Sequence, residues 1–269
     1  MLSGKFELNL HSSKRVMQAL CAVGKGNMKK VKIKVCSLGA LPREFDKNIL
    51  VKIKSKIFDI VPEIHSYNLR VESDLYEWAY SDKILSTQIP SSDDSDILIV
   101  LTSIPLEENY YSRRLQDNVV VFTFYEISNY LKLDNIPLEN VIKRLFYSYS
   151  LVYLRNNKKI PMAYELSNFT HDDTRGCIYD MNGVKDDITS SCHKPIVCDE
   201  CCERMRNEKI SSETLETVKS ELIKITKNRF YVIADLVKQY PIASLILSSV
   251  WAVALGVTGS LIANAVSGA

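Results

Sequence analysis

The feature that most constrains the fold is a long uncharged segment near the end of the chain, "SLILSSVWAVALGVTGSLIANAV". It belongs to a run from residue 242 to residue 266 that contains no Asp, Glu, Lys or Arg. A helix of about 25 residues, rising about 1.5 Å per residue, is longer than the ~30 Å hydrocarbon core of a bilayer. We predict a transmembrane segment over residues 241–269. A hairpin buried in the core of a soluble domain is the alternative.

Small and hydroxylated residues recur at every fourth position of this segment. They are Ser244, Ser248, Ala252, Gly256, Ser260 and Asn264. Small residues at this spacing let helices approach closely, and hydroxyl or amide groups inside a membrane usually face a partner or water. We therefore predict that the helix forms a homo-oligomer, either a tight bundle or a ring in which this stripe lines a pore. A lipid-facing anchor that tolerates small residues remains the alternative.

Basic residues lie on only one side of the segment. Lys224, Lys227, Arg229 and Lys238 precede it, and no charged residue follows it. Because Lys and Arg are enriched on the cytoplasmic flank of membrane spans, we predict a single-pass protein whose bulk is cytoplasmic. The short C-terminal end is then expected on the far side of the membrane.

The first part of the chain alternates strand-like and helix-like patterns. Apolar runs predict strands at "VKIKV" (31–35), "IHSYNLRV" (64–71), "ILIVL" (97–101) and "NVVVFTF" (118–124). Helical spacing predicts helices over residues 43–61, ended by Pro62, and from Pro137 to about residue 155. Strands alternating with helices predict an α/β domain over residues 1–160, with a mixed or mostly parallel sheet and flanking helices.

A second helical pattern connects this part of the chain to the uncharged segment. Over residues 209–240 we predict one amphipathic helix, with apolar residues at heptad-like spacing: Leu215, Val218, Leu222, Ile225, Val232 and Leu236. About three heptads is the lower limit for a coiled coil. The pattern fits self-association and packing on the chain's own domain equally well.

Cysteine and histidine residues concentrate in the aperiodic region 161–208. Cys198 and Cys201 form a CxxC pair, and His171 with Cys177 supplies a second pair upstream. Three thiolates and one imidazole suit a tetrahedral structural Zn²⁺. Cys192 and His193 are replacement ligands, and buried free thiols or a CxxC redox pair are the alternatives. The crowding of cysteines into one site, instead of spread disulfides, indicates a reducing compartment.

The order of these features resembles the archaemetzincin family of metzincin-like zinc peptidases. The resemblance rests on "SLGALP" after the first strand, "SRRLQDNVVVF", a following helix, and a cysteine set closed by CxxC. In that family a structural zinc is held by four cysteines, separately from the catalytic zinc. The resemblance would match Cys198 and Cys201 to the closing pair, Cys177 to an early ligand and Met181 to a methionine that follows it. His171 would then replace the missing cysteine.

The catalytic motif of that family is missing. The helix that should carry HExxH reads "ENVIKRLFYSYSLVYL" and contains no histidine. Peptidase activity by that mechanism is excluded because neither the metal ligands nor the general base are there. The chain also has no GxxxxGK[ST], GxGxxG or GxSxG motif. We predict a domain without enzymatic activity, a pseudo-protease that keeps its structural metal.

Together these patterns predict a membrane effector. With 34 basic and 32 acidic residues the net charge is +2, which argues against nucleic acid as a partner. We expect the soluble domain to sense an unknown ligand or protein and the C-terminal helix to oligomerise and permeabilise the bilayer. Such an architecture suits antiviral defence or a toxin. The alternative is a tail-anchored scaffold with a peptidase-like binding domain and no pore; a membrane-tethered hydrolase is a third hypothesis.

Overall fold

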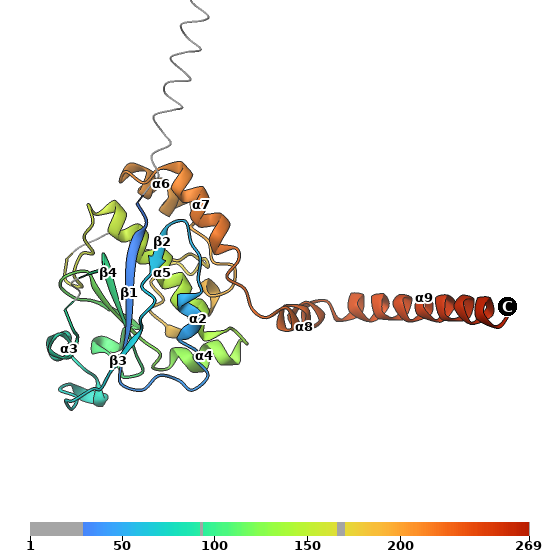
Figure 1. Cartoon of the computed structure of the whole chain (residues 1–269), viewed down its shortest axis with the longest axis horizontal. Helices are drawn as coiled ribbons and strands as arrows, with labels where there is room; N and C mark the ends of the chain where they lie inside the picture. Colours follow the sequence, from blue (N-terminus) through green and yellow to red (C-terminus); the bar gives the residue numbers. More distant parts are fainter. Residues whose placement is uncertain (1–28, 92–93, 166–169, 269) are drawn as a thin grey trace, which may run out of the picture.

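The centre of the molecule is a mostly parallel β-sheet (Figure 1). The structure, a computed structural model, describes residues 29–91, 94–165 and 170–268; residues 1–28 of the predicted domain lie outside this part. The strands follow the order β2–β1–β4–β6–β5, and β3 pairs with the second half of β1. Their bounds are β1 Val31–Leu38, β2 Phe58–Ile60, β3 His65–Tyr67, β4 Ile97–Thr102, β5 Ser112–Arg114 and β6 Val119–Thr123. Only β5 is antiparallel to its neighbour.

The apolar runs of the sequence form the three inner strands. Every residue of β4 and β6 is buried, as expected for parallel strands that are covered on both faces. Strand β1 pairs with β4 through registers such as Val35 with Ile99, and β4 pairs with β6 through Val100 with Val121. The predicted α/β class with a mostly parallel sheet is therefore confirmed.

Helices and short helical turns cover the two faces of the sheet. The α-helices are α2 Asn48–Val51, α3 Asp82–Gln88, α4 Ile127–Leu133, α5 Leu138–Arg155, α6 Asp199–Asn207, α7 Ser212–Leu222, α8 Arg229–Gln239 and α9 Pro241–Ser267. The 3₁₀ turns are η1 Tyr76–Trp78, η2 Glu107–Asn109 and η3 Lys185–Ser191. On one face the core joins the sheet to α4, α5, α6 and α7, so the region of the cysteines shares that core. On the other face a smaller core includes Leu85 of α3.

The prediction of a helix over residues 43–61 is wrong. Only the four residues of α2 are helical, and Phe58–Ile60 forms strand β2 beside β1. In this strand Phe58 pairs with Val31, and Phe58 is buried. Pairing with β1 provides hydrogen-bond partners for the backbone of residues 58–60 and buries the Phe58 ring. These gains outweigh the helical spacing of the neighbouring Ile residues.

The single connecting helix predicted over residues 209–240 is instead two helices, α7 and α8. The chain leaves helical geometry after Ile223, and Asn228 caps α8 by accepting a hydrogen bond from the Phe230 N–H group. Four residues of the supposed heptad seam are buried in the core of the soluble domain: Leu215, Val218, Leu222 and Ile225. They cannot form a seam between copies of the chain.

A buried carboxylate, that of Glu221, connects helix α7 to the rest of the domain. Glu221 accepts hydrogen bonds from the Ser55 hydroxyl at 2.7 Å, the Lys56 N–H group at 3.0 Å and the Tyr147 hydroxyl at 2.9 Å. These bonds join α7 to α5 and to the loop before β2. The folded domain therefore extends to the end of α7.

Helices α8 and α9 extend away from the domain (Figure 1). Helix α9 has 27 residues, begins with Pro241 and buries none of its side chains. By length and composition it is long and apolar enough to cross a membrane, and it is the one described helix with that property.

Candidate metal centre

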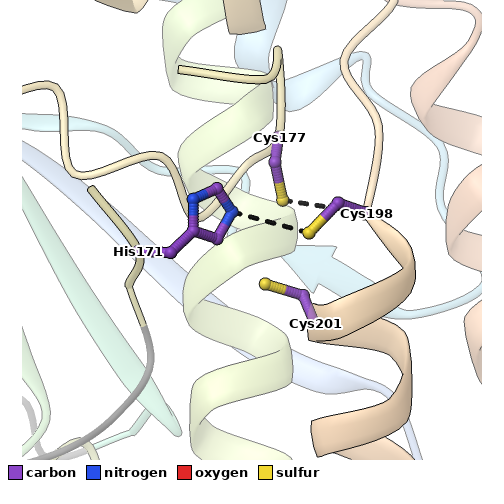
Figure 2. A group of neighbouring side chains, drawn as sticks. All are labelled: His171, Cys177, Cys198 and Cys201. Atoms are coloured by element: carbon purple, nitrogen blue, oxygen red, sulfur yellow. Dashed lines mark hydrogen bonds between the residues drawn. The ribbon is translucent and has the colours of Figure 1, made fainter. Parts of the chain in front are cut away.

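Four side chains from distant positions meet beside α6. The donor atoms of His171, Cys177, Cys198 and Cys201 all lie within 4.8 Å of one another. Figure 2 shows the imidazole and the three thiols directed toward one point. The three thiols are buried, and the His171 side chain is only 7% exposed. The structure thus brings together all four of the ligands that the sequence pattern suggested.

The distances between donor atoms suit a tetrahedral metal ion. Ligands about 2.3 Å from a tetrahedral centre lie roughly 3.8 Å from one another. The Nε2 atom of His171 lies 3.5 Å from the Sγ atom of Cys198, and no pair in the cluster exceeds 4.8 Å. Small rotations of side chains would bring all four donors to the same distance from one ion.

The CxxC pair uses the start of a helix. Cys198 has extended backbone geometry at the N-cap of α6, and Cys201 lies in the first turn. Residues three apart on a helix share one face, so both thiols point the same way. Partial positive charge at a helix N-terminus also favours thiolates there.

The tautomer of His171 is fixed by a backbone carbonyl. Its Nδ1 atom lies 3.0 Å from the carbonyl oxygen of Asp173. Since a carbonyl only accepts, Nδ1 carries the proton and Nε2 presents a lone pair to the cluster. This is the form of histidine that binds a metal.

A tight turn places Cys177. Gly176 has a φ of +74°, and a Cβ atom at this position would lie 3.1 Å from the carbonyl oxygen of Ser190. Glycine is therefore required on both conformational and steric grounds. The turn is held by Asp180, whose Oδ2 atom accepts hydrogen bonds from the N–H groups of Arg175 and Cys177 at 3.1 and 2.9 Å.

The other carboxylate oxygen of Asp180 gives independent support for a cation. This Oδ1 atom is buried, accepts no hydrogen bond from any described group, and lies 3.5 Å from Nε2 of His171. Burial, followed by the negative charge of Cys177, raises the pKa of the Asp180 carboxyl. The lone pairs of these two atoms, held away from water, are stabilised either by a proton between them or by positive charge nearby. A metal ion held by the cluster would supply that charge.

The surroundings of the cluster shift the pKa values of Cys177 and Cys201 in opposite directions. The pKa of Cys177 is lowered chiefly because the Cys201 thiol donates a hydrogen bond to it, while burial acts in the opposite direction. The pKa of Cys201 is raised by the same hydrogen bond and then by burial. The lowered pKa of Cys177 favours the thiolate form, which is the form that binds a metal.

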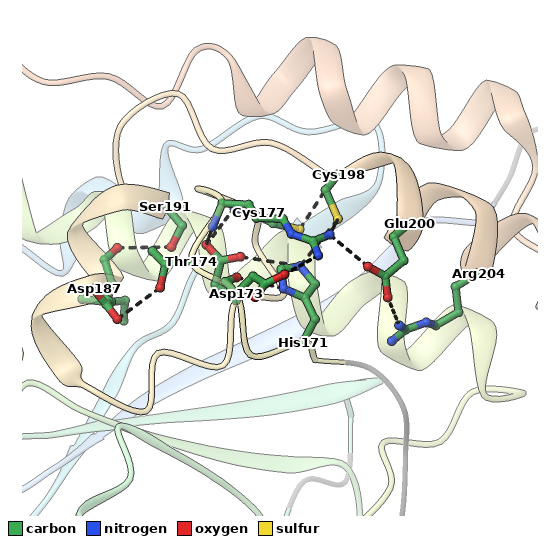
Figure 3. A network of polar contacts seen from close by, with 12 residues as sticks. His171, Asp173, Thr174, Cys177, Asp187, Ser191, Cys198, Glu200 and Arg204 are labelled. Atoms are coloured by element: carbon green, nitrogen blue, oxygen red, sulfur yellow. Dashed lines mark hydrogen bonds and ion pairs between the residues drawn. The ribbon is translucent and has the colours of Figure 1, made fainter.

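Charged side chains surround the cluster on its exposed side. Arg175 donates to Glu200 at 2.9 Å and to Asp173 at 2.6 Å, and its guanidinium lies 3.8 Å from the sulfur of Cys198. Glu200 also pairs with Arg204 at 3.0 Å (Figure 3). This network ties the His171 loop to the first turns of α6 and offsets the negative charge of the thiolates.

The replacement ligands considered from the sequence lie elsewhere. Cys192 is a buried thiol that is not a member of the cluster. Burial raises the pKa of Cys192 to about 12, as expected for an inert core thiol. His193 accepts a hydrogen bond at Nδ1 from the Lys227 N–H group at 3.1 Å.

Helix α5 forms hydrogen bonds with the region that carries the cluster, residues 171–208, which we call the metal element. The Asn140 side-chain amide donates to the carbonyl oxygen of Cys192 at 3.0 Å, and Arg144 donates to that of Asp180 at 3.4 Å. The carbonyl oxygen of Ser148 accepts a hydrogen bond from the Tyr179 hydroxyl at 3.0 Å. Helix α5 therefore binds the 171–192 segment.

The predicted oligomerisation stripe lies on α9, distant from the cluster in the sequence, and all its members are unburied. Adding a Cβ atom to Gly256 or Gly259 would meet nothing within 4 Å. Ser248 donates its hydroxyl proton to the carbonyl oxygen of Leu245 in its own helix at 2.8 Å. The stripe is thus open to a partner, and part of its polarity is satisfied internally.

Comparisons with protein-family models, with curated proteins and with solved structures gave no match to this chain.

Proposed function

We propose that the chain is a single-span membrane effector. In this proposal a soluble, catalytically inactive domain senses a ligand or a protein, and α9 associates with copies of itself and permeabilises the bilayer. The observation that carries it is α9 itself, an uncharged helix of 27 residues with no buried side chain and a regular series of small and polar residues. A plain anchor needs the length and the apolar character but not the series.

Zn²⁺ is the proposed occupant of the His171/Cys177/Cys198/Cys201 cluster. Thiolate and imidazole donors in a tetrahedral arrangement favour zinc over the harder cations Mg²⁺ and Ca²⁺. Four protein ligands leave no open position for a substrate, so the metal would be structural. Its role would be to hold the loop after residue 170 to the start of α6, within an archaemetzincin-like domain that has no catalytic centre.

Hydrogen bonds beyond the end of α7 connect the metal element to the linker before α8. They could transmit a movement of the domain to α8 and α9. The Lys227 N–H group donates to His193, and the Lys194 N–H group donates to the carbonyl oxygen of Ile225 at 2.6 Å. Asn140 bridges the two segments by donating to the carbonyl oxygens of Cys192 and Thr226. A ligand that shifts the 192–194 segment would therefore move the base of α8.

The geometry of α9 suggests which residues meet. In a helix of 3.6 residues per turn, a spacing of four advances the stripe by about 40° per step and about 200° over its length. Straight parallel helices would touch along only part of it. Helices that cross at about −40°, as in small-xxx-small dimers, would meet at a short central contact around Ala252, Gly256 and Ser260.

A tail-anchored scaffold is the second candidate. It is favoured by the hydroxyl groups of α9 that bond their own helix: Ser249 donates to Leu245, and Thr258 donates to Ala254 and Leu255. Such hydroxyls can face lipid at little cost. In either case we propose that the bulk of the chain is cytoplasmic, since Lys and Arg residues are concentrated just before α9.

Expression in bacterial cells separates the two candidates. The effector should arrest growth and depolarise the membrane, and Gly256→Leu/Ser260→Leu should abolish both effects. The matched control is Ala254→Leu/Thr258→Leu, which places the same two leucines on the opposite face of α9 and should retain the effects. Depolarisation that is equal in both variants, or absent from a membrane-inserted wild type, would contradict the effector and leave the scaffold.

A further inference from the structure

Helix α8 carries an apolar stripe that nothing in the described part of the soluble domain covers. None of its residues is buried. Five large apolar side chains in or next to the helix are between 46% and 69% exposed: Phe230, Ile233, Leu236, Val237 and Tyr240. At about 100° per residue they occupy one arc of roughly 120°, which is the pattern of an amphipathic helix.

The opposite face of α8 carries Tyr231 among polar residues, and its Asp235 faces the linker that precedes the helix. Asp235 forms an ion pair with Lys227 at 2.9 Å, and the hydrogen bond from Lys227 lowers the pKa of the Asp235 carboxyl. Lys238 and Gln239 lie on the same side of the helix. The ion pair fixes which face of α8 turns back toward the domain and leaves the apolar stripe outward.

The position of α8 identifies what covers the stripe. Its last residue, Gln239, is separated from the start of α9 at Pro241 by Tyr240 alone. If α9 spans the bilayer, as proposed above, the C-terminal end of α8 lies within about one helical turn of the headgroup region. A bend at Tyr240, which has non-helical backbone geometry, would bring the whole stripe against the lipid surface.

The composition of α8 matches that location. Aromatic rings such as Phe230 and Tyr240 favour the interface between headgroups and acyl chains, and Arg229 and Lys238 can extend their charged ends to lipid phosphates. Pairing with the α8 of a second copy is a weaker solution, because its 11 residues are fewer than two heptads.

We propose that α8 is an interfacial helix that lies in the headgroup region on the side of the soluble domain, with Phe230, Ile233 and Val237 inserted toward the acyl chains. This inference depends on the proposed membrane span of α9. It adds a lipid-binding surface at the point where movements of the 225–227 linker would reach the membrane. Anionic lipids are its preferred partners because Lys224, Arg229 and Lys238 flank or belong to the helix.

Depth-dependent fluorescence quenching tests this in the full chain, in vesicles of phosphatidylcholine and phosphatidylglycerol with brominated acyl chains. The chain has two tryptophans, Trp78 in the soluble domain and Trp251 in α9. In a Trp78→Phe variant, Trp251 reports on α9. In a Trp78→Phe/Trp251→Phe background, Phe230→Trp reports on the stripe, and Gln239→Trp is the matched control on the opposite face of α8.

We expect Trp251 to be quenched by bromines deep in the acyl chains. The Phe230→Trp reporter should be quenched by shallow bromines, at least about threefold more strongly than the Gln239→Trp reporter. Equal, weak quenching at positions 230 and 239 together with strong quenching of Trp251 would overturn the interfacial helix and keep the membrane span. Absence of quenching at Trp251 would overturn both. Quenching of position 230 that is lost at low protein-to-lipid ratio would indicate self-association instead and would also overturn it.

Discussion

The Nε2 atom of His171 lies 3.5 Å from the Sγ atom of Cys198, although 27 positions separate the two residues in the sequence. Cys177 and Cys201 complete the same buried cluster. Three turns must therefore close around one point: the loop at His171, the glycine turn before Cys177 and the start of α6. A metal ion bound to all four groups would contribute its binding free energy to the folding of this element.

Replacement of a cluster thiol should remove the metal. Cys201→Ser should lower zinc content in the purified full chain from about one ion per chain to near zero, because a serine hydroxyl does not replace a thiolate ligand. Cys202→Ser, at the next position of α6 and outside the cluster, should retain the metal. Elemental analysis, and the absorption of the Co²⁺-substituted protein, measure both. Equal metal content in the two variants would contradict the assigned ligands.

Asp180→Asn should weaken metal binding without removing a ligand. The amide oxygen can still accept from the N–H groups of Arg175 and Cys177, but the amide nitrogen would then donate to Nε2 of His171 and compete with the metal. Loss of such a supporting group typically costs about 10- to 100-fold in affinity. Competition with a chromophoric chelator gives the affinity. Unchanged affinity would show that the unpaired carboxylate oxygen has no part in the site.

Gly176→Ala should destabilise the metal element. The substitution forces a Cβ atom into a backbone with a φ of +74° and within 3.1 Å of the Ser190 carbonyl oxygen. Strain of this kind costs about 1–3 kcal/mol. Gly183→Ala is the control because its Cβ would meet nothing within 4 Å. The free energy of unfolding, measured with a denaturant, should fall for the first variant only; equal values would refute the strained turn.

The junction between His193 and Lys227 should weaken in acid. Burial, then the charges of Lys227 and Lys194, lower the pKa of His193, so its imidazole stays neutral in the folded protein and accepts the Lys227 N–H group. The unfolded chain takes up a proton near its ordinary pKa of about 6.5, so this stabilisation is complete above that pH and is lost as pH falls through the lowered pKa.

His193→Asn isolates this effect, because the amide oxygen of asparagine can accept the same hydrogen bond without titrating. Between about pH 7.5 and pH 5.5 the unfolding free energy of the wild type should decrease more steeply than that of the variant. Protonation of the cluster thiols weakens metal binding equally in both proteins, so its effect on the unfolding free energy cancels in the comparison. Parallel pH profiles would mean that His193 does not control the junction.

The inner strands and the four cluster residues could be predicted because their signals are local. Continuous apolar runs mark β4 and β6, and the CxxC pair marks Cys198 and Cys201. Gly176, Arg175 and Asp180 were missed as parts of the site. They lie in an aperiodic segment, where a polar residue that supports a ligand resembles any loop residue, and only the glycine directly before Cys177 gave a signal that could have been used.

The prediction of one heptad-like helix over residues 209–240 failed for a different reason. Leu215, Val218 and Leu222 have the spacing of a coiled-coil seam, but the same spacing serves a helix packed on its own domain. The break between α7 and α8 left a signal in Asn228, a good N-cap residue directly before Arg229. Greater weight on this cap than on the heptad spacing would have divided the segment correctly.

Dye release from vesicles reconstituted with the purified full chain is the most direct test of the central claim. Wild-type protein and the Ala254→Leu/Thr258→Leu control should release an encapsulated small dye in a manner that depends on protein concentration. Gly256→Leu/Ser260→Leu should insert equally, as judged by quenching of Trp251, but should leave the vesicles intact. Intact vesicles with inserted wild-type protein, or equal release by the two double variants, would contradict the account.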